Sequence, residues 1–434
     1  MVLVERSPGP SSTPLHPDPG PGPARRTTVL SPAASPVTKA LDPSPTAAHA
    51  GTVAGTRPRH AWVDVARGLV VTMVVVMHVG IYHYLPMTQG EGANAFWTGV
   101  NSVLQVLRMP SLLILSGWLA GSRIRAGLGD PRTRRSIAAN AYLYVLWLAL
   151  YTVIAVALGA TTMAQAPAPS TFLGQLLTPY STLWFLAALA WYTLALAALR
   201  RAPAAAVLAG LFALGWVSTV VWPVEYGLWA NIPHMAIFFG IGVYARPAIE
   251  AIGRRPVVTL VAGVGVATLA GEIARSLTAS DLPAYPATVA QSLAGVAAVF
   301  GAASLLTRYA ERATRPLAWV GRRTLAIYVG HYPVIMLLST VSAGALYDVD
   351  RAVLADGLGA WLYPILATGM IVLVGVVARE LAGRLRLGWL FQMPQRTPLA
   401  RPLRAALTRP LRAALARPLR MPLARPLRTL VPAR

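Results

Sequence analysis

The chain has 434 residues, of which 55% are hydrophobic and only 12% are charged. Soluble domains carry about 25% charged residues, so this composition excludes an ordinary soluble protein. The 38 Lys and Arg residues outnumber the 15 Asp and Glu residues, which indicates either a nucleic-acid partner or loops on the cytoplasmic side of a membrane, and their distribution favours the membrane.

The N-terminal segment, residues 1–57, is rich in Pro, Ser, Thr, Ala and Gly and is predicted to be a disordered tail. From residue 61, apolar runs alternate with short polar breaks, and a hydrocarbon core of about 30 Å needs around 20 helical residues to cross. The predicted fold is all-α, a polytopic membrane protein with about ten transmembrane helices. These spans are predicted near residues 61–85, 98–120, 137–158, 182–199, 204–222, 228–246, 256–274, 286–307, 317–340 and 359–382.

The arginines predict the orientation of the spans. The breaks after spans two, four, six and eight, together with the start of span nine, hold 15 arginines, whereas the opposite breaks hold 2. By the positive-inside rule these arginine-rich breaks are cytoplasmic, and both termini are then cytoplasmic as well.

A basic repeat forms the C-terminal tail, residues 386–434. Arg-Pro-Leu-Arg recurs at 401–404, 409–412, 417–420 and 425–428, and a proline in every repeat prevents one long helix. We expect this tail to bind anionic lipid headgroups. A repeat with no role of its own and a nucleic-acid contact are the weaker alternatives, and no nucleic-acid partner is expected.

Ionisable residues within the first span are the strongest functional signal, since charges inside a membrane are costly and are usually retained for function. Arg67 and His78 are 11 residues apart, which at about 100° per residue is three turns plus about 20°. They therefore share one helix face, about 16 Å apart along the axis. Asp64 lies one turn before Arg67, within pairing range. This alignment favours function over a snorkelling anchor for Arg67 and a satisfied interhelical hydrogen bond for His78.

His331 lies near the middle of span nine and is the second candidate. His234 is predicted near the outer end of span six, where a structural role is favoured, and His83 is predicted at the membrane interface. No two histidines have metal-ligand spacing, so no metal is expected. Gly117 and Gly121 predict close helix packing.

Five sequence blocks occur in the order and spacing of one known family. They are Trp62–Gly68 followed by His78, Met109–Leu119, Leu183–Leu189, Phe238–Gly242 and Leu325–His331. Through these blocks the chain resembles the acyltransferase 3 family of integral membrane acyltransferases over about residues 60–385. It departs from many relatives at Arg108, where they carry His, and the family's Arg-x-x-Arg motif can be read as Arg132–Arg135.

The resemblance implies transfer of an acyl group, often acetyl, from a cytoplasmic co-substrate such as acetyl-CoA or another acyl-CoA. The acceptor would be a hydroxyl of a cell-envelope glycan, lipid or small molecule at the plasma (inner) membrane, and the low Lys and high Ala and Arg usage indicates a GC-rich bacterial genome. Such a transfer needs a base for the hydroxyl proton, and an imidazole suits that role. We expect His78 to be this base and His331 to assist it or to contact the acceptor. Ser116 is interpreted as a packing residue rather than an acyl-carrying nucleophile.

Arginines are suited to the phosphates of such a donor or to polarising its thioester carbonyl. We expect Arg67 to act in this way, held in place by Asp64, together with Arg132, Arg134 and Arg135. Because Arg67 is predicted near the cytoplasm and His78 in the outer half of the membrane, an extended donor threading between the helices would connect them.

Two other functions are compatible with the sequence. A transporter or flippase for a lipid-linked or amphipathic substrate would also carry intramembrane charges, although the chain has no clear inverted repeat and few intramembrane acids. A membrane scaffold organised by its basic tail would not need His78.

Overall fold

The computed structural model describes residues 61–88, 92–221, 231–280, 283–355 and 357–394. Every regular element among these residues is a helix, so the all-α prediction is confirmed. The predicted disordered tail and the Arg-Pro-Leu-Arg repeats lie outside the described residues. The helices are α1 (Ala61–Val79), η1 (Gly80–Tyr84), α2 (Leu85–Met87), α3 (Gly92–Ala126), α4 (Pro131–Ala157), η2 (Pro169–Thr171), α5 (Phe172–Leu177), α6 (Trp184–Ala198), α7 (Ala204–Val221), α8 (Asn231–Tyr244), α9 (Arg246–Ile252), α10 (Pro256–Ala279), α11 (Tyr285–Tyr309), α12 (Glu311–Gly321), α13 (Thr324–Ser342), α14 (Tyr347–Ala355), α15 (Gly357–Arg384) and η4 (Gly388–Leu390).

Seven helices in the described part of the chain are long and apolar enough to cross a membrane. They are the continuous α1–η1–α2 segment, α3, α4, α10, α11, α13 and α15. The pair α8 and α9, bent by 84°, raises the number to eight if it forms one span, and α6 and α7 are shorter apolar helices. The chain is therefore a multi-pass membrane protein, while the count of ten and the cytoplasmic termini remain predictions.

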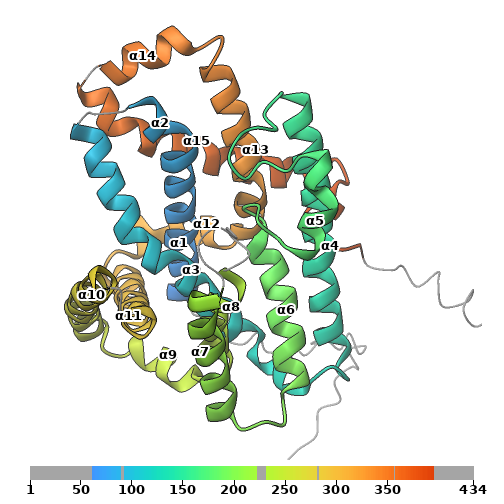
Figure 1. Cartoon of the computed structure of the whole chain (residues 1–434), viewed down its shortest axis with the longest axis vertical. Helices are drawn as coiled ribbons and strands as arrows, with labels where there is room; N and C mark the ends of the chain where they lie inside the picture. The colour runs from blue at the N-terminus through green and yellow to red at the C-terminus, as the bar shows by residue number, and fades with distance from the viewer. Residues whose placement is uncertain (1–60, 89–91, 222–230, 281–282, 356, 395–434) are drawn as a thin grey trace, which may run out of the picture. The chain divides into compact units, whose positions relative to one another are not determined.

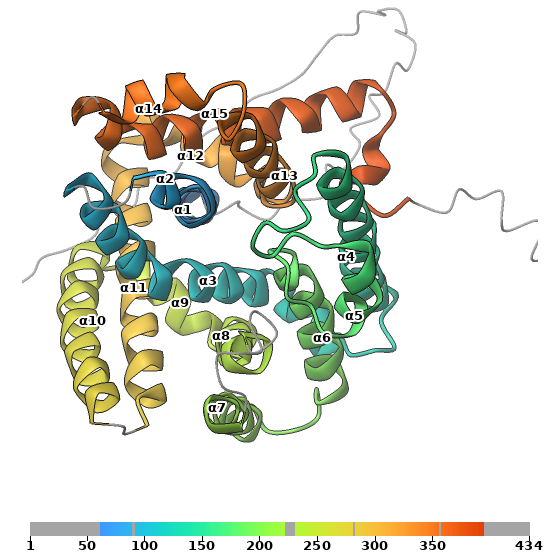
Figure 2. The same ribbon diagram turned by 45° about the horizontal axis from the view of Figure 1, so that its top comes forward.

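Helix α1 lies among the other helices, in contact with α3, α11, α12, α13 and α15 (Figure 1, Figure 2). Its apolar residues face several neighbours at once, because Val70, Val71, Val74 and Val75 are all at most 1% exposed. A helix that is apolar on all sides is stable only when other helices or lipid surround it. Asp64 and His78 of α1 are buried among these neighbours, and Arg67 is partly buried.

Small residues bring two helix pairs into backbone contact. A Cβ on Gly117 of α3 would lie 2.2 Å from the Phe239 carbonyl oxygen of α8, and a Cβ on Gly321 of α12 would lie 1.8 Å from the Asp64 carbonyl oxygen of α1. No larger residue fits either position without separating the helices. The packing role predicted for Gly117 is thus confirmed.

The ninth predicted span, 317–340, is wrong at its start. The structure breaks the segment at Arg322 and Arg323, so that α12 ends at Gly321 and the apolar α13 begins at Thr324. The reason is local, because α12 is a short amphipathic helix with an internal proline, Pro316, rather than the first turns of a span.

Candidate functional site

Two histidines from distant parts of the sequence meet inside the helical bundle. The Nδ1 atom of His78 on α1 lies 2.9 Å from the Nε2 atom of His331 on α13. The two rings stack with centroids 4.7 Å apart, and the residues are only 8% and 1% exposed. Sequence analysis selected both histidines, and the structure brings them into direct contact.

The hydrogen-bond partners determine which nitrogen of each ring carries a proton when the pair is neutral. Nδ1 of His331 faces the Tyr328 carbonyl oxygen, which can only accept, so Nδ1–H donates and Nε2 of His331 is left as an acceptor. His78 must then donate from its own Nδ1–H to that acceptor. This assignment leaves a lone pair on Nε2 of His78, the form that a general base requires.

A change in helix geometry directly follows His78. Residues Gly80–Tyr84 form the π-helix η1, which places the Tyr82 ring parallel to the His78 ring at a centroid distance of 5.5 Å. Such π-turns occur frequently at functional sites. Gly80 allows close contact with α3, because a Cβ there would lie 2.4 Å from the Nδ2 atom of Asn101.

Tyrosine hydroxyls fix the segment of α13 that carries His331. Pro333 has no N–H for the Val329 carbonyl one turn earlier, and the Tyr151 hydroxyl of α4 donates to that carbonyl at 2.9 Å. The Tyr328 hydroxyl donates to the Thr182 carbonyl oxygen at 2.5 Å. These bonds hold the His331 ring in place against α4 and the segment before α6.

A cavity of about 220 Å³, here called the His78 cavity, opens beside the histidine pair. Besides His78 it is lined by Tyr82, Gln105, Arg108 and Gln165, together with apolar residues. The sequence could have predicted Arg108 as a site residue, because it is an intramembrane charge like Arg67. In the sequence analysis it is named only as a difference from the family. Gln165 lies in an apolar loop, and nothing in the sequence predicts it as a site residue.

A second cavity, of about 130 Å³, contains Arg67 and is called the Arg67 cavity. Ser116, Thr324 and Leu325 line it, and Tyr328 lines both this cavity and the His78 cavity. Because α1 is continuous between Arg67 and His78, the two side chains are separated by about 16 Å along its axis. They belong to neighbouring cavities that meet at Tyr328.

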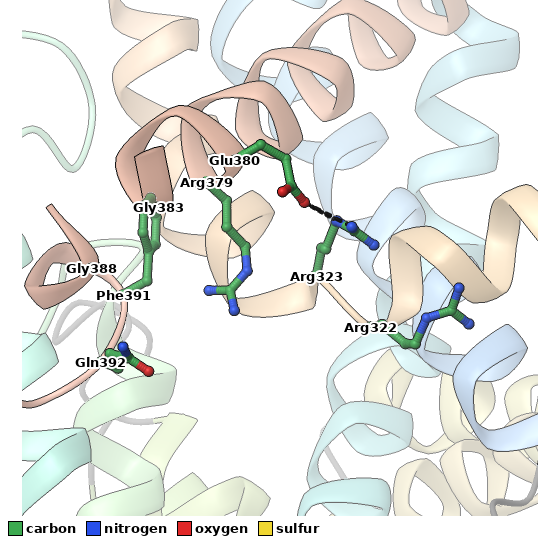
Figure 3. Close-up of a pocket in the computed structure, with 8 residues that line it drawn as sticks. All are labelled: Arg322, Arg323, Arg379, Glu380, Gly383, Gly388, Phe391 and Gln392. Atoms are coloured by element: carbon green, nitrogen blue, oxygen red, sulfur yellow. Dashed lines mark hydrogen bonds and ion pairs between the residues drawn. The ribbon is translucent and has the colours of Figure 1, made fainter. Parts of the chain in front are cut away.

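A third cavity, of about 380 Å³, lies at the break between α12 and α13 and is called the arginine cavity (Figure 3). Arg322, Arg323 and Arg379 line it against a single acid, Glu380. Glu380 pairs with Arg323 at 2.7 Å, and the Arg379 guanidinium lies 6.0 Å from the centre of the Phe391 ring. Because Arg322 also forms an ion pair with Asp64 at 3.9 Å, the three arginines exceed their two acidic partners by one positive charge, which favours an anion in this cavity.

Asp64 is buried, with 7% exposure, and its carboxylate lies 3.9 Å from Arg322 of the arginine cavity. Asp64, which is predicted to hold Arg67 in place, therefore contacts Arg322 at the break between α12 and α13. Its proposed effect on Arg67 remains a prediction.

The three arginines at the start of α4 are exposed. Arg132 forms an ion pair with Asp130 at 3.0 Å, and this guanidinium holds the pKa of the Asp130 carboxyl below its usual range. Arg134 donates to the carbonyl oxygens of Leu128 and Gly129. None of Arg132, Arg134 and Arg135 lines the His78, Arg67 or arginine cavity.

The other two histidines of the described helices, His83 and His234, pack against neighbouring side chains. His83 is 2% exposed and hydrogen-bonds to Ser339 at 3.1 Å and Tyr363 at 2.6 Å, and its position at the membrane interface stays a prediction. His234 packs edge-on against Tyr285 at 4.8 Å. Within the described ranges, no three His, Asp or Glu side chains come together as a metal site.

Buried ionisable side chains such as this imidazole pair, in a multi-pass membrane protein and beside a cavity, mark a candidate functional site. The profile of the acyltransferase 3 family, described as an acyltransferase domain, matches residues 60–380, and the chain belongs to this family. This range contains His78, His331, the His78 cavity, the Arg67 cavity and four of the eight residues that line the arginine cavity. No match was found among curated proteins or among solved structures.

Proposed function

We propose that this protein is a membrane O-acyltransferase of the bacterial plasma membrane. It moves an acyl group, most simply acetyl, from a cytoplasmic acyl-CoA to a hydroxyl of a cell-envelope glycan, lipid or small molecule. The observation that carries the proposal is the His78–His331 pair, whose hydrogen bonds leave the Nε2 lone pair of His78 beside a polar cavity. Membership of the acyltransferase family supports the reaction class.

The three cavities support a path for an extended donor. Arg322 and Arg323 line the arginine cavity, the next two residues of α13 line the Arg67 cavity, and Tyr328 joins that cavity to the His78 cavity. Helix α13 advances about 6 Å from Thr324, which lines the Arg67 cavity, to Tyr328. Donor phosphates bind at the cytoplasmic end, and the thioester reaches towards His78.

The chemistry follows from the protonation of the pair. Nε2 of His78 takes the proton of the acceptor hydroxyl as the hydroxyl oxygen attacks the thioester carbonyl carbon. The C–S bond then breaks, the ester remains on the acceptor, and the proton passes from His78 to the departing thiolate. The positive charge that His78 carries meanwhile is stabilised through its Nδ1–H bond to His331.

Arginines provide the donor contacts in this proposal. Arg67 lies in the Arg67 cavity, about 16 Å along α1 from His78 and the thioester, where it binds a phosphate of the donor, and Asp64 orients it. Arg132, Arg134 and Arg135 supply further positive charge at the cytoplasmic entrance. The C-terminal repeats bind anionic lipids at the same side of the membrane.

A transporter or flippase is the second candidate, favoured by the three cavities that residues of α13 or of the break before it line. Consumption of the thioester separates the two functions, since a transporter leaves acetyl-CoA intact. Because the chain has no cysteine, the purified protein adds no thiol of its own to a thiol-reagent assay of released CoA, and the thiols of the envelope extract are alkylated and the alkylating agent is removed beforehand. Envelope extract supplies the acceptor, and His83→Ala is a control that removes a buried histidine from the same helical segment.

Wild-type protein and His83→Ala, corrected for the folded fraction, should release CoA, and folded His78→Ala should not. Intact acetyl-CoA with the wild type, or full release by His78→Ala, would contradict the proposal.

A further inference from the structure

Arg108 is a buried cation without an acidic partner in the described part of the chain. It lies on α3, is 5% exposed, and lines the His78 cavity. Its Nε atom has no hydrogen-bond partner, and Nη1 reaches only the Asn101 carbonyl oxygen, at 3.4 Å. A buried charge is tolerated when it has a counter-charge, so this guanidinium is incomplete without a ligand.

Gln165 provides a second unmatched polar group on the same cavity. Its Oε1 atom is buried without a hydrogen-bond partner, although the side chain is hydrogen-bonded to Tyr82. Its backbone has a φ of 65°, in the left-handed region that disfavours a side chain. Strain of this kind persists where surrounding structure enforces it, commonly at functional sites.

The two unmatched atoms differ in what they can bind. The guanidinium of Arg108 donates and carries charge, so it matches a carboxylate or a phosphate, whereas Oε1 of Gln165 accepts and matches a hydroxyl. The amides of Gln105 and Asn231 also line the cavity and can bind further hydroxyls. At about 220 Å³ the cavity is smaller than the ~300–1,000 Å³ of typical ligand pockets, which suits a single sugar residue or a group of that size.

We propose that the acceptor is a polyhydroxylated molecule bearing a permanent negative charge, a carboxylate or a phosphate monoester. Arg108 binds that charge, Gln165 accepts a hydrogen bond from one hydroxyl, and another hydroxyl faces Nε2 of His78. This inference rests on the proposed acyltransferase function. The oxyanion formed during acyl transfer is short-lived, whereas Arg108 is buried at all times, so a charge on the substrate itself is the better counterpart.

Direct binding to purified protein in zwitterionic lipid nanodiscs tests the proposal. The probes are methyl glucoside, methyl glucuronide and methyl glucoside 6-phosphate, which share a ring and differ in charge. Wild-type protein should bind at least one anionic probe ten or more times more tightly than the neutral probe, and the better of the two identifies carboxylate or phosphate. Arg108→Lys should keep a weaker preference, and Arg108→Gln should lose it without a change in acetyl-CoA affinity.

Equal binding of the three probes, no binding of any of them, or an unchanged preference in Arg108→Gln would overturn the proposal. If Arg108→Gln does not fold, Arg108→Met replaces it, since an apolar side chain of similar length removes the same charge. CoA release is measured in the same samples. Absence of CoA release with an intact charge preference would count against the acyltransferase function alone, and release without the preference would count against the anionic acceptor alone.

Discussion

The contact between the two histidines predicts a specific pattern of activity losses. Replacing His331 by Leu removes the acceptor for the His78 Nδ1–H and the stabilisation of the charge that forms on His78. A hydrogen bond to a charged group contributes about 1.5–3 kcal/mol, which corresponds to about a 10- to 150-fold lower kcat. His78→Ala removes the base itself and should lower kcat by about 10²–10⁴-fold.

His331→Gln is the conservative comparison, because its amide oxygen can replace Nε2 as the acceptor, and it should retain more activity than His331→Leu. The assay is the initial rate of labelled acetyl transfer from acetyl-CoA in membrane vesicles that contain the native acceptor. Since His331 acts through His78, the double variant should be no slower than His78→Ala. Wild-type kcat in folded His331→Leu, or losses that multiply in the double variant, would refute the pairing.

Three further outcomes are expected. Arg67→Ala should raise the KM for acetyl-CoA more than it lowers kcat, and an effect on kcat alone, with an unchanged KM, would place Arg67 outside donor binding. Gly321→Ala should lower the thermal unfolding temperature, because its Cβ would meet the Asp64 carbonyl oxygen at 1.8 Å and overpacking typically costs about 1–3 kcal/mol; an unchanged temperature would contradict that contact. Tyr151→Phe leaves the Val329 carbonyl oxygen without its donor and should destabilise by about 1–3 kcal/mol in the same melt, with Tyr142→Phe as a more exposed control.

The sequence predicted the helices well because apolar length is a direct signal of a membrane span. Each predicted span corresponds to a helix or helix pair, and the main boundary error arose where Arg322 and Arg323 interrupt an otherwise continuous apolar run. Helical periodicity correctly put Arg67 and His78 on one continuous helix.

From the sequence, the candidate site could be predicted only as separate residues and not as a spatial arrangement. His78 and His331 were each predicted because they are ionisable residues within a span. Their contact depends on how α1 and α13 pack, which cannot be inferred from the sequence alone. The rule that ionisable residues within a span are functional candidates also predicts Arg108 as a site residue. Gln165 was beyond reach, because its importance comes from a loop conformation and a shared cavity rather than from its residue type.

The central claim, acyl transfer with His78 as the base, is tested most directly by labelled acetyl-CoA added to everted membrane vesicles. Label entering envelope material is measured for wild type, His78→Ala and the control His83→Ala at equal amounts of folded protein. The account predicts incorporation with wild type and His83→Ala and near-background incorporation with His78→Ala. Equal incorporation by wild type and His78→Ala, or none by wild type, would contradict it.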